Sequence, residues 1–200
     1  MIVMTTIAYN RMTKAFFERT GAVTINLTKL LTRRSRLEKE LAQIHAGAKV
    51  IIEFGGDNCR FDWKNIARNV NGIHLPKTSI EEFHSTYKKV IDVVKEKGAV
   101  PVLLGLAPID SEKYFSFIKD AKRREQITSW LGGNYLYLAN IHEKYVQEVK
   151  RIAKQEEAEY VDVASIFRTS ADFDKYLEKD GISLNKAGYL RVQGLVQDIM

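Results

Sequence analysis

The sequence predicts a three-layer α/β domain built on a parallel sheet, and three observations support this fold class. Short apolar runs alternate with stretches of helical periodicity, and connections of roughly ten or more residues imply right-handed crossovers between parallel strands. The run Ala99–Leu106 is apolar throughout, which suits a strand that is covered on both faces of its sheet. The 200 residues, 45% of them hydrophobic and 28% charged, fit one domain over residues 1–200.

The predicted strands and helices alternate along the whole chain. Apolar and β-branched runs indicate strands at Ile2–Ala8, Ala22–Leu27, Lys49–Phe54, Ala99–Leu106 and Tyr160–Ala164. Helical periodicity indicates helices at Lys14–Glu18, Ser35–Ile44, Ser79–Lys97, Ser111–Phe117, Glu125–Leu131, Leu136–Gln155 and Asn185–Val196. The Ser79–Lys97 helix has the strongest pattern because Ser79 and Glu82 form a capping box and Gly98 follows its end. Its buried stripe is predicted to consist of Phe83, Tyr87, Val90, Ile91 and Val94.

Composition excludes several classes of protein. Cys59 is the only cysteine, which rules out an intrachain disulfide and a cysteine-rich zinc site. No apolar run reaches the roughly 18 residues of a membrane span, and the first residues do not resemble a secretion signal. We therefore expect a cytoplasmic protein with no membrane association.

The formal net charge of +6 favours an anionic ligand without naming one. The densest basic clusters, at residues 33–36 and 122–124, fall in stretches predicted to be helical. Neither cluster carries the interleaved aromatic residues of a single-strand binder, so solvated helix faces are the preferred interpretation and no nucleic-acid partner is predicted.

Functional groups in such a sheet gather where the strands end at their carboxyl side. The segments that follow the predicted strands contain Thr6, then Asp57, Asn58 and Asp62, and finally Asp180 and Ser183, but no histidine. The pair Gly55-Gly56 is interpreted as a tight turn, since it lacks the further glycines and the lysine of a phosphate loop. Two carboxylates and an amide are a weak pattern for a metal, so no metal and no cofactor are predicted.

Several short motifs, in order from Val50 to Gly188, resemble the GDSL/SGNH hydrolases. They are EFGGDNC at 53–59 with DW at 62–63, HLPKT at 74–78, APID at 107–110 with YF at 114–115, and DGISLNKAG at 180–188. The resemblance implies a flavodoxin-like domain with a parallel sheet of about five strands in the order 2-1-3-4-5. It also implies ester, acyl or carbohydrate deacetylase chemistry.

The sequence departs from this family at all four signature positions. Thr6 stands where the nucleophilic serine belongs, and Leu31 stands where a glycine supplies an oxyanion N–H. Asp57 replaces the oxyanion asparagine, because Asn-Asp is inverted to Asp57-Asn58, and Ser183 replaces the general-base histidine. Asp180, which would orient that histidine, remains. A hydroxyl needs a base within hydrogen-bond reach, so we expect the standard mechanism to be lost.

The sequence thus predicts an SGNH-hydrolase-like protein with a degenerate site and a binding or regulatory role. A small-molecule, carbohydrate or acyl ligand would occupy the cleft, lined by Leu31, Asn58 and His74 beside the matched positions. One alternative is a working esterase or deacetylase in which displaced residues, such as His74 with Thr6 or Ser183, rebuild the site. A second alternative is a structural partner protein. Surface or packing roles are predicted for His45, His84, His142, Cys59, Trp63, Tyr114 and Trp130.

Overall fold

The computed structural model describes residues 2–6, 23–25, 42, 44–170 and 172–198, with backbone alone in the first two segments. The strands in these residues are β1 (Ile2–Thr6), β2 (Val23–Ile25), β3 (Lys49–Glu53), β4 (Val100–Leu104) and β5 (Glu159–Val161). The helices are α4 (Trp63–Arg68), α5 (Ile80–Glu96), α6 (Ser111–Ser116), α7 (Ala121–Leu131), α8 (Leu136–Gln155), α9 (Val163–Arg168), the 3-10 helix η1 (Phe173–Tyr176) and α10 (Lys186–Asp198).

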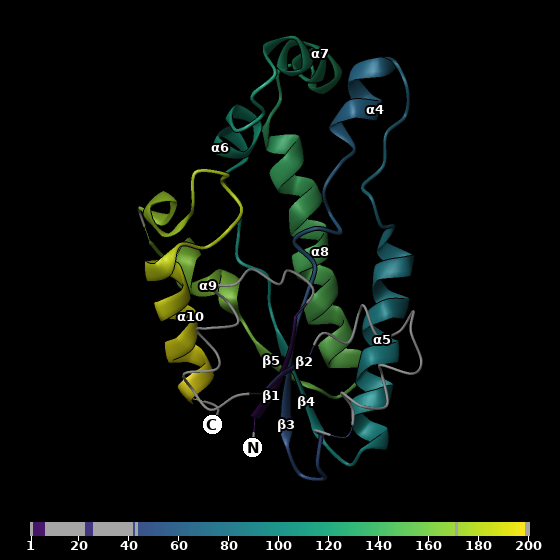
Figure 1. Cartoon of the computed structure of the whole chain (residues 1–200), viewed down its shortest axis with the longest axis vertical. Helices are drawn as coiled ribbons and strands as arrows, with labels where there is room; N and C mark the ends of the chain where they lie inside the picture. The colour runs from purple at the N-terminus through teal and green to yellow at the C-terminus, as the bar shows by residue number, and fades with distance from the viewer. Residues whose placement is uncertain (1, 7–22, 26–41, 43, 171, 199–200) are drawn as a thin grey trace.

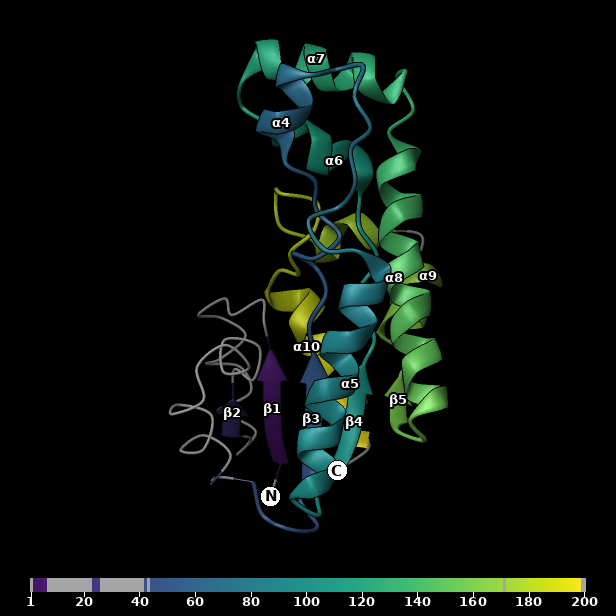
Figure 2. The same cartoon turned by 90° about the vertical axis from the view of Figure 1, so that its right-hand side faces the viewer.

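The described strands form one parallel sheet. Its order is β2-β1-β3-β4-β5, and each neighbouring pair runs in the same direction (Figure 2). The register aligns Thr6 at the end of β1 with Glu53 at the end of β3. The predicted α/β class with a parallel sheet is confirmed.

The strands β3 and β4 are buried on both faces, and the alternation of their side chains decides which residues face which layer. Val50 and Ile52 of β3 and Leu103 of β4 pack with α5 and α8 in one apolar cluster. Ile51 of β3 and Val102 of β4 pack with α9 and α10 in another. Figure 1 shows the two helix pairs on opposite sides of the strands. Because β3 and β4 meet apolar side chains on both faces, they take the continuous hydrophobic composition of a central parallel strand.

Three short helices build a separate lobe beyond the carboxyl ends of the strands. Figures 1 and 2 show α4, α6 and α7 together at one end of the molecule, next to the start of α8. Phe61, Ile66 and Ile127 form the buried centre of this lobe with Leu131 and Leu138. The loops that follow β3 and β4 therefore run between the sheet and the lobe.

Helix α5 matches its prediction closely, because its sequence pattern and its packing agree. It spans Ile80–Glu96, its N-cap Ser79 accepts a hydrogen bond from the Glu82 N–H, and its buried residues are the five predicted. Helix α8 has the predicted bounds.

Helix capping corrects two predictions and accounts for one helix that was not predicted. The run predicted as a strand at Tyr160–Ala164 ends as a strand at Val161, because Asp162 caps a new helix, α9, through the Ser165 N–H. The helix predicted at Glu125–Leu131 begins earlier, at Ala121, behind the N-cap Asp120. Helix α4 was not predicted and begins behind Asp62. The predicted helix Lys14–Glu18 and most of Ser35–Ile44 lie outside the described residues.

Within the described residues, no helix combines the length and apolar composition needed to cross a bilayer.

Tyr87 fixes the end of β3 to α5. Its buried hydroxyl donates a hydrogen bond to the Phe54 carbonyl at 2.8 Å and accepts one from the Phe54 N–H at 3.3 Å. The rings of Phe54 and Tyr87 are stacked, with centroids 3.6 Å apart. Tyr87 therefore satisfies the backbone at the point where the chain leaves the sheet.

We predict that Tyr87→Phe destabilises the fold by about 1–3 kcal/mol, because it leaves two buried backbone groups of Phe54 without a partner. The free energy of urea-induced unfolding measures the effect. Tyr137→Phe is the matched control, since its ring is 38% exposed and its hydroxyl has no hydrogen bond to a described residue. It should change stability by no more than about 0.5 kcal/mol. Equal effects of the two substitutions would contradict the role given to Tyr87.

Candidate functional site

The residues matched to the hydrolase nucleophile and first oxyanion donor are only partly described. Thr6 is the last residue of β1, and its backbone lies beside Glu53 of β3. Leu31 lies outside the described residues. The turn that carries Asp57 follows β3 after three further residues. Thr6 thus ends β1 and Asp57 follows the neighbouring strand β3, both at the carboxyl side of the sheet.

A tight turn after β3 presents Asp57 and Asn58. The Asn58 N–H donates to the Gly55 carbonyl at 2.9 Å, and Gly55 has a φ of +146°. This φ is one that other residues rarely adopt, and a Cβ at Gly55 would also lie 2.7 Å from a methyl group of Leu106, so both favour glycine here. The Asn58 side-chain amide donates to the Thr78 hydroxyl at 3.0 Å, which holds the turn against the segment before α5.

Asp180 and Ser183 form a closed hydrogen-bonded turn. Asp180 Oδ1 accepts from the N–H groups of Ile182 (2.9 Å) and Ser183 (2.8 Å), and Asp180 Oδ2 accepts from the Ser183 hydroxyl at 2.7 Å. Partial burial would raise the pKa of Asp180, but these hydrogen bonds and the charge of Arg60 outweigh it and lower the pKa. The carboxylate is therefore ionised at neutral pH and is a weak base.

The same turn is held against the lobe by a close backbone approach. The Asp110 N–H donates to the Gly181 carbonyl at 2.9 Å, while the Asp110 side chain caps α6 through the Lys113 N–H. Gly181 has a φ of +70°, and a Cβ there would lie 2.5 Å from the Tyr114 nitrogen. Only glycine fits this contact, so residues 180–183 have a fixed position beside the loop after β4.

Arg60 contributes a positive charge to this site, and no motif in the sequence pointed to it. Its Nε lies 3.0 Å from Asp57 Oδ1, an ion pair without hydrogen-bond alignment. Its charge also helps to lower the pKa of Asp180. At Tyr114 burial raises the pKa to about 12, and the charge of Arg60 opposes this shift. The charge of Arg60 thus acts on the turn after β3 and on the turn at residues 180–183.

A small cavity of about 10 Å³ lies beside Arg60 and is also lined by His142, Cys59, Gly56 and Ile182. Burial lowers the pKa of His142 to about 4, so its imidazole is neutral at pH 7. Burial also raises the pKa of Cys59 to about 12, and its thiol donates to the Gly56 carbonyl at 3.3 Å. Neither group has the properties of an activated base or nucleophile.

The other candidate residues from the sequence, His74, Asp62 and His84, make contacts that stabilise loops and helices. His74 forms a 2.7 Å hydrogen bond to the Asn69 carbonyl and packs edge-on against Trp130. Asp62 is the N-cap of α4, and its carboxylate accepts hydrogen bonds from the N–H groups of Lys64 and Asn65. His84 pairs with the buried Glu148 at 2.7 Å. Among the described residues, no three His, Cys, Asp or Glu side chains are grouped to bind one metal ion.

Comparison with solved structures shows the SGNH/GDSL hydrolase fold over nearly the whole chain. A lipase/acylhydrolase from Enterococcus faecalis has a TM-score of 0.57 and 13% identity, covering 99% of this chain and 94% of that one. A GDSL-like lipase from Bacteroides thetaiotaomicron has a TM-score of 0.59 and 13% identity, covering 99% and 85%. An acetylxylan esterase from Geobacillus stearothermophilus has a TM-score of 0.55 and 14% identity, covering 98% and 92%. No protein-family model and no curated protein sequence matches the chain.

We predict a pH-dependent contribution of Asp180 to stability. Because its pKa is lowered on folding, its carboxylate stabilises the fold above the unfolded pKa of about 3.9, and this contribution disappears as the pH falls through the folded pKa. Asp180→Asn should therefore cost about 1 kcal/mol at pH 7, and the difference from wild type should shrink below about pH 4. Urea unfolding from pH 3 to 7 measures it.

Asp92→Asn is the control for this measurement. The Asp92 carboxylate pairs with Lys88 one helical turn away, and both side chains are nearly half exposed. Its replacement should cost no more than about 0.5 kcal/mol. If the Asp180→Asn difference were the same at pH 3 and pH 7, the charged hydrogen bonds assigned to Asp180 would be wrong.

Proposed function

We propose that this chain is an SGNH-type domain that binds a small-molecule, carbohydrate or acyl ligand and has lost ester hydrolysis. The observation that carries the proposal is the hydrogen bond from the Ser183 hydroxyl to Asp180 Oδ2. In the family pattern this carboxylate would orient an imidazole three residues later. Here the residue at that position is Ser183, whose hydroxyl donates to the carboxylate, as do the backbone N–H groups of Ile182 and Ser183.

Proton transfer is the step that this arrangement weakens most. A serine at position 183 cannot act as the general base that a histidine would supply. The lowered pKa of Asp180 makes its carboxylate a poor acceptor for a hydroxyl proton. Asp57 at the oxyanion position carries a negative charge that would repel a developing oxyanion, although Arg60 stands 3.0 Å away. An oxyanion donor is worth about 10²–10³ in rate, so its loss adds to the loss of the base.

Two buried polar atoms support a binding role for the same edge. Arg60 Nε and Asn58 Oδ1 are both buried and have no hydrogen-bond partner among the described residues. Buried polar groups in folded proteins nearly always find a partner, because an unpaired one costs about 1–3 kcal/mol. A ligand that accepts from Arg60 and donates to Asn58 would supply both hydrogen bonds.

The alternative function, an esterase with displaced residues, is favoured by one observation: His142 and Arg60 line the same cavity. That cavity of about 10 Å³ has room for about one water molecule, which limits a substrate and a bound ligand equally. The pKa of His142, lowered to about 4, makes it a weak general base. We therefore prefer the binding role.

We predict that the purified protein hydrolyses p-nitrophenyl acetate no faster than its Thr6→Ala variant, because neither Thr6 nor Ser183 has a base to remove its proton. Release of p-nitrophenol, followed from the first seconds, measures both turnover and burst. A burst that depends on Thr6 would support the esterase alternative instead.

The binding role is tested separately with acetylated xylooligosaccharides and short-chain acyl glycosides. A ligand that binds only the folded state raises the melting temperature, by an amount that grows with its concentration. Arg60→Gln should abolish the rise, while Arg124→Gln, which removes an arginine of α7, should retain it. No rise with any probe, together with a second chain that co-purifies, would favour the structural-partner alternative.

A further inference from the structure

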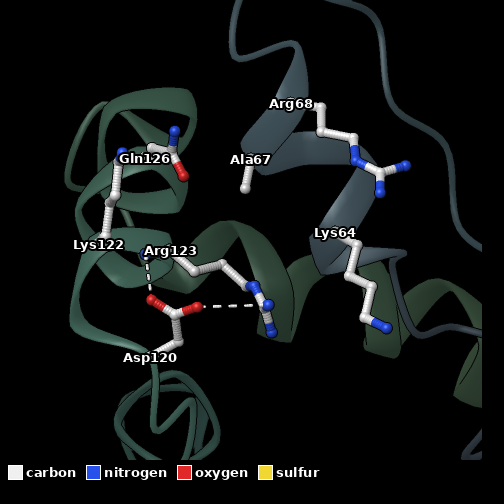
Figure 3. A pocket seen from close by; sticks show the side chains of 7 residues that line it. All are labelled: Lys64, Ala67, Arg68, Asp120, Lys122, Arg123 and Gln126. Atoms are coloured by element: carbon white, nitrogen blue, oxygen red, sulfur yellow. Dashed lines mark hydrogen bonds and ion pairs between the residues drawn. The ribbon is translucent and has the colours of Figure 1, made fainter.

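The lobe carries a second candidate site, a basic groove formed by two adjoining hollows between α4, α6 and α7. The first has a volume of about 400 Å³ and is lined by Lys64, Ala67, Arg68, Asp120, Lys122, Arg123 and Gln126 (Figure 3). The second has a volume of about 390 Å³ and shares Asp120 and Arg123 with the first. Volumes of this size are typical of sites for small molecules.

The groove concentrates the positive charge of the chain. Four cationic side chains line the first hollow, and the second adds Arg60, Lys77 and Lys119. Among the described residues that line the two hollows, Asp120 is the one carboxylate. Seven cations against one carboxylate give an excess of six, which equals the formal net charge of +6 of the whole chain. A cleft lined by one sign of charge focuses its field and attracts counter-ions.

Most of these cations have no ionic partner in the part of the chain that the structure describes. Asp120 pairs with Arg123 at 3.3 Å, and the dashed lines in Figure 3 both join these two residues. Arg60 pairs with Asp57. Those without an ion pair or side-chain hydrogen bond to a described residue are Lys64, Arg68, Lys77, Lys119 and Lys122. Their mutual repulsion opposes folding, and a bound polyanion would relieve it.

Aromatic side chains give the second hollow a different character from the first. Phe61, Trp63, Tyr114 and Phe117 line it beside the cations. The rings of Trp63 and Tyr114 are 5.5 Å apart, and the Phe117 side chain is 50% exposed. A ligand that fills both hollows therefore meets an aromatic wall at one end and mainly charged groups at the other.

We propose that this groove binds a small molecule that carries two or more phosphate groups on a planar ring. Phosphate groups supply the most negative charge in the least volume, and guanidinium groups bind them through paired hydrogen bonds. A monocarboxylate or a neutral sugar would leave most of the cations uncompensated. The ring would stack in the aromatic hollow, and the phosphates would extend past Arg123 toward Lys64 and Lys122. Of the described matched positions, Asp57, Asp180 and Ser183 lie outside both linings, and Arg60 is shared with the first site; the proposal does not rest on the proposed function.

Isothermal titration with ATP, inorganic tripolyphosphate and adenosine tests the proposal. We expect ATP to bind more tightly than tripolyphosphate and adenosine to bind too weakly to measure. The affinity for both anions should fall as the salt concentration is raised. A double variant, Lys64→Ala with Lys122→Ala, should lower the affinity for ATP by about tenfold or more. The matched control is Lys150→Ala with Lys154→Ala, two exposed lysines of α8 outside the groove lining, and it should bind ATP as wild type does.

Phe117→Ala separates the two hollows. Because Phe117 is exposed at the end of α6, the variant should fold normally, lose affinity for ATP and keep its affinity for tripolyphosphate. Three results would overturn the proposal: no binding of ATP, equal loss of ATP binding in the two lysine pairs, or unchanged ATP affinity in Phe117→Ala. Binding of a ten-nucleotide single-stranded RNA more than 100-fold tighter than ATP would also overturn it, by showing a nucleic-acid surface instead.

Discussion

Burial of β3 and β4 on both faces is the constraint on which the rest of the structure depends. Ile51 packs into one apolar layer while its neighbours Val50 and Ile52 pack into the other, so helices must cover both sides of the sheet. Polar groups have no place on either face, and they collect where the strands end. The turn after β3, the loop after β4 and residues 180–183 meet there because the sheet leaves them that edge alone.

At that edge two carboxylates have partners within the chain. Asp180 accepts three hydrogen bonds from residues 182 and 183, and Asp57 stands beside Arg60. Gly181 is fixed by its close approach to α6 and so holds Asp180 in place without an imidazole. The Asp180 carboxylate therefore stabilises a turn. The adjoining lobe contributes an excess of positive charge, because the described lining of its groove holds seven cations and one carboxylate, Asp120.

The sequence predicted the elements whose local pattern agrees with their packing. The apolar spacing and cap of α5 were sufficient to define that helix and its buried stripe. The run Tyr160–Ala164 was predicted to be a strand because its apolar residues alternate with polar ones. Its central residue Asp162 is instead the N-cap of α9, a role that the alternating pattern does not reveal. The order of motifs placed Asp57, Asp180 and Ser183 near strand ends. Their hydrogen bonds could not be predicted, since they depend on side-chain rotation.

Contacts between distant segments were beyond the sequence pattern. His142 lies 86 positions along the chain from Gly56, counted on the printed sequence, yet both line one cavity. Lys122 and Arg123 were interpreted as a solvated helix face because no aromatic residue interrupts their cluster. The aromatic residues that accompany them in the groove come from α4, α6 and the loop before α4. Only the packing of the lobe brings these groups together.

Whether the scaffold still supports ester hydrolysis is tested most directly by restoring the family residues together. The variant combines Thr6→Ser, Leu31→Gly, Asp57→Asn, Asn58→Asp and Ser183→His, and its control carries Thr6→Ala in place of Thr6→Ser. The folded variant should hydrolyse p-nitrophenyl acetate slowly but measurably faster than the control, because catalytic residues act as a unit, and Ser183→His alone should gain almost nothing. A folded five-fold variant no faster than its control, or a single Ser183→His change that gains as much as all five, would contradict a degenerate hydrolase site at these positions.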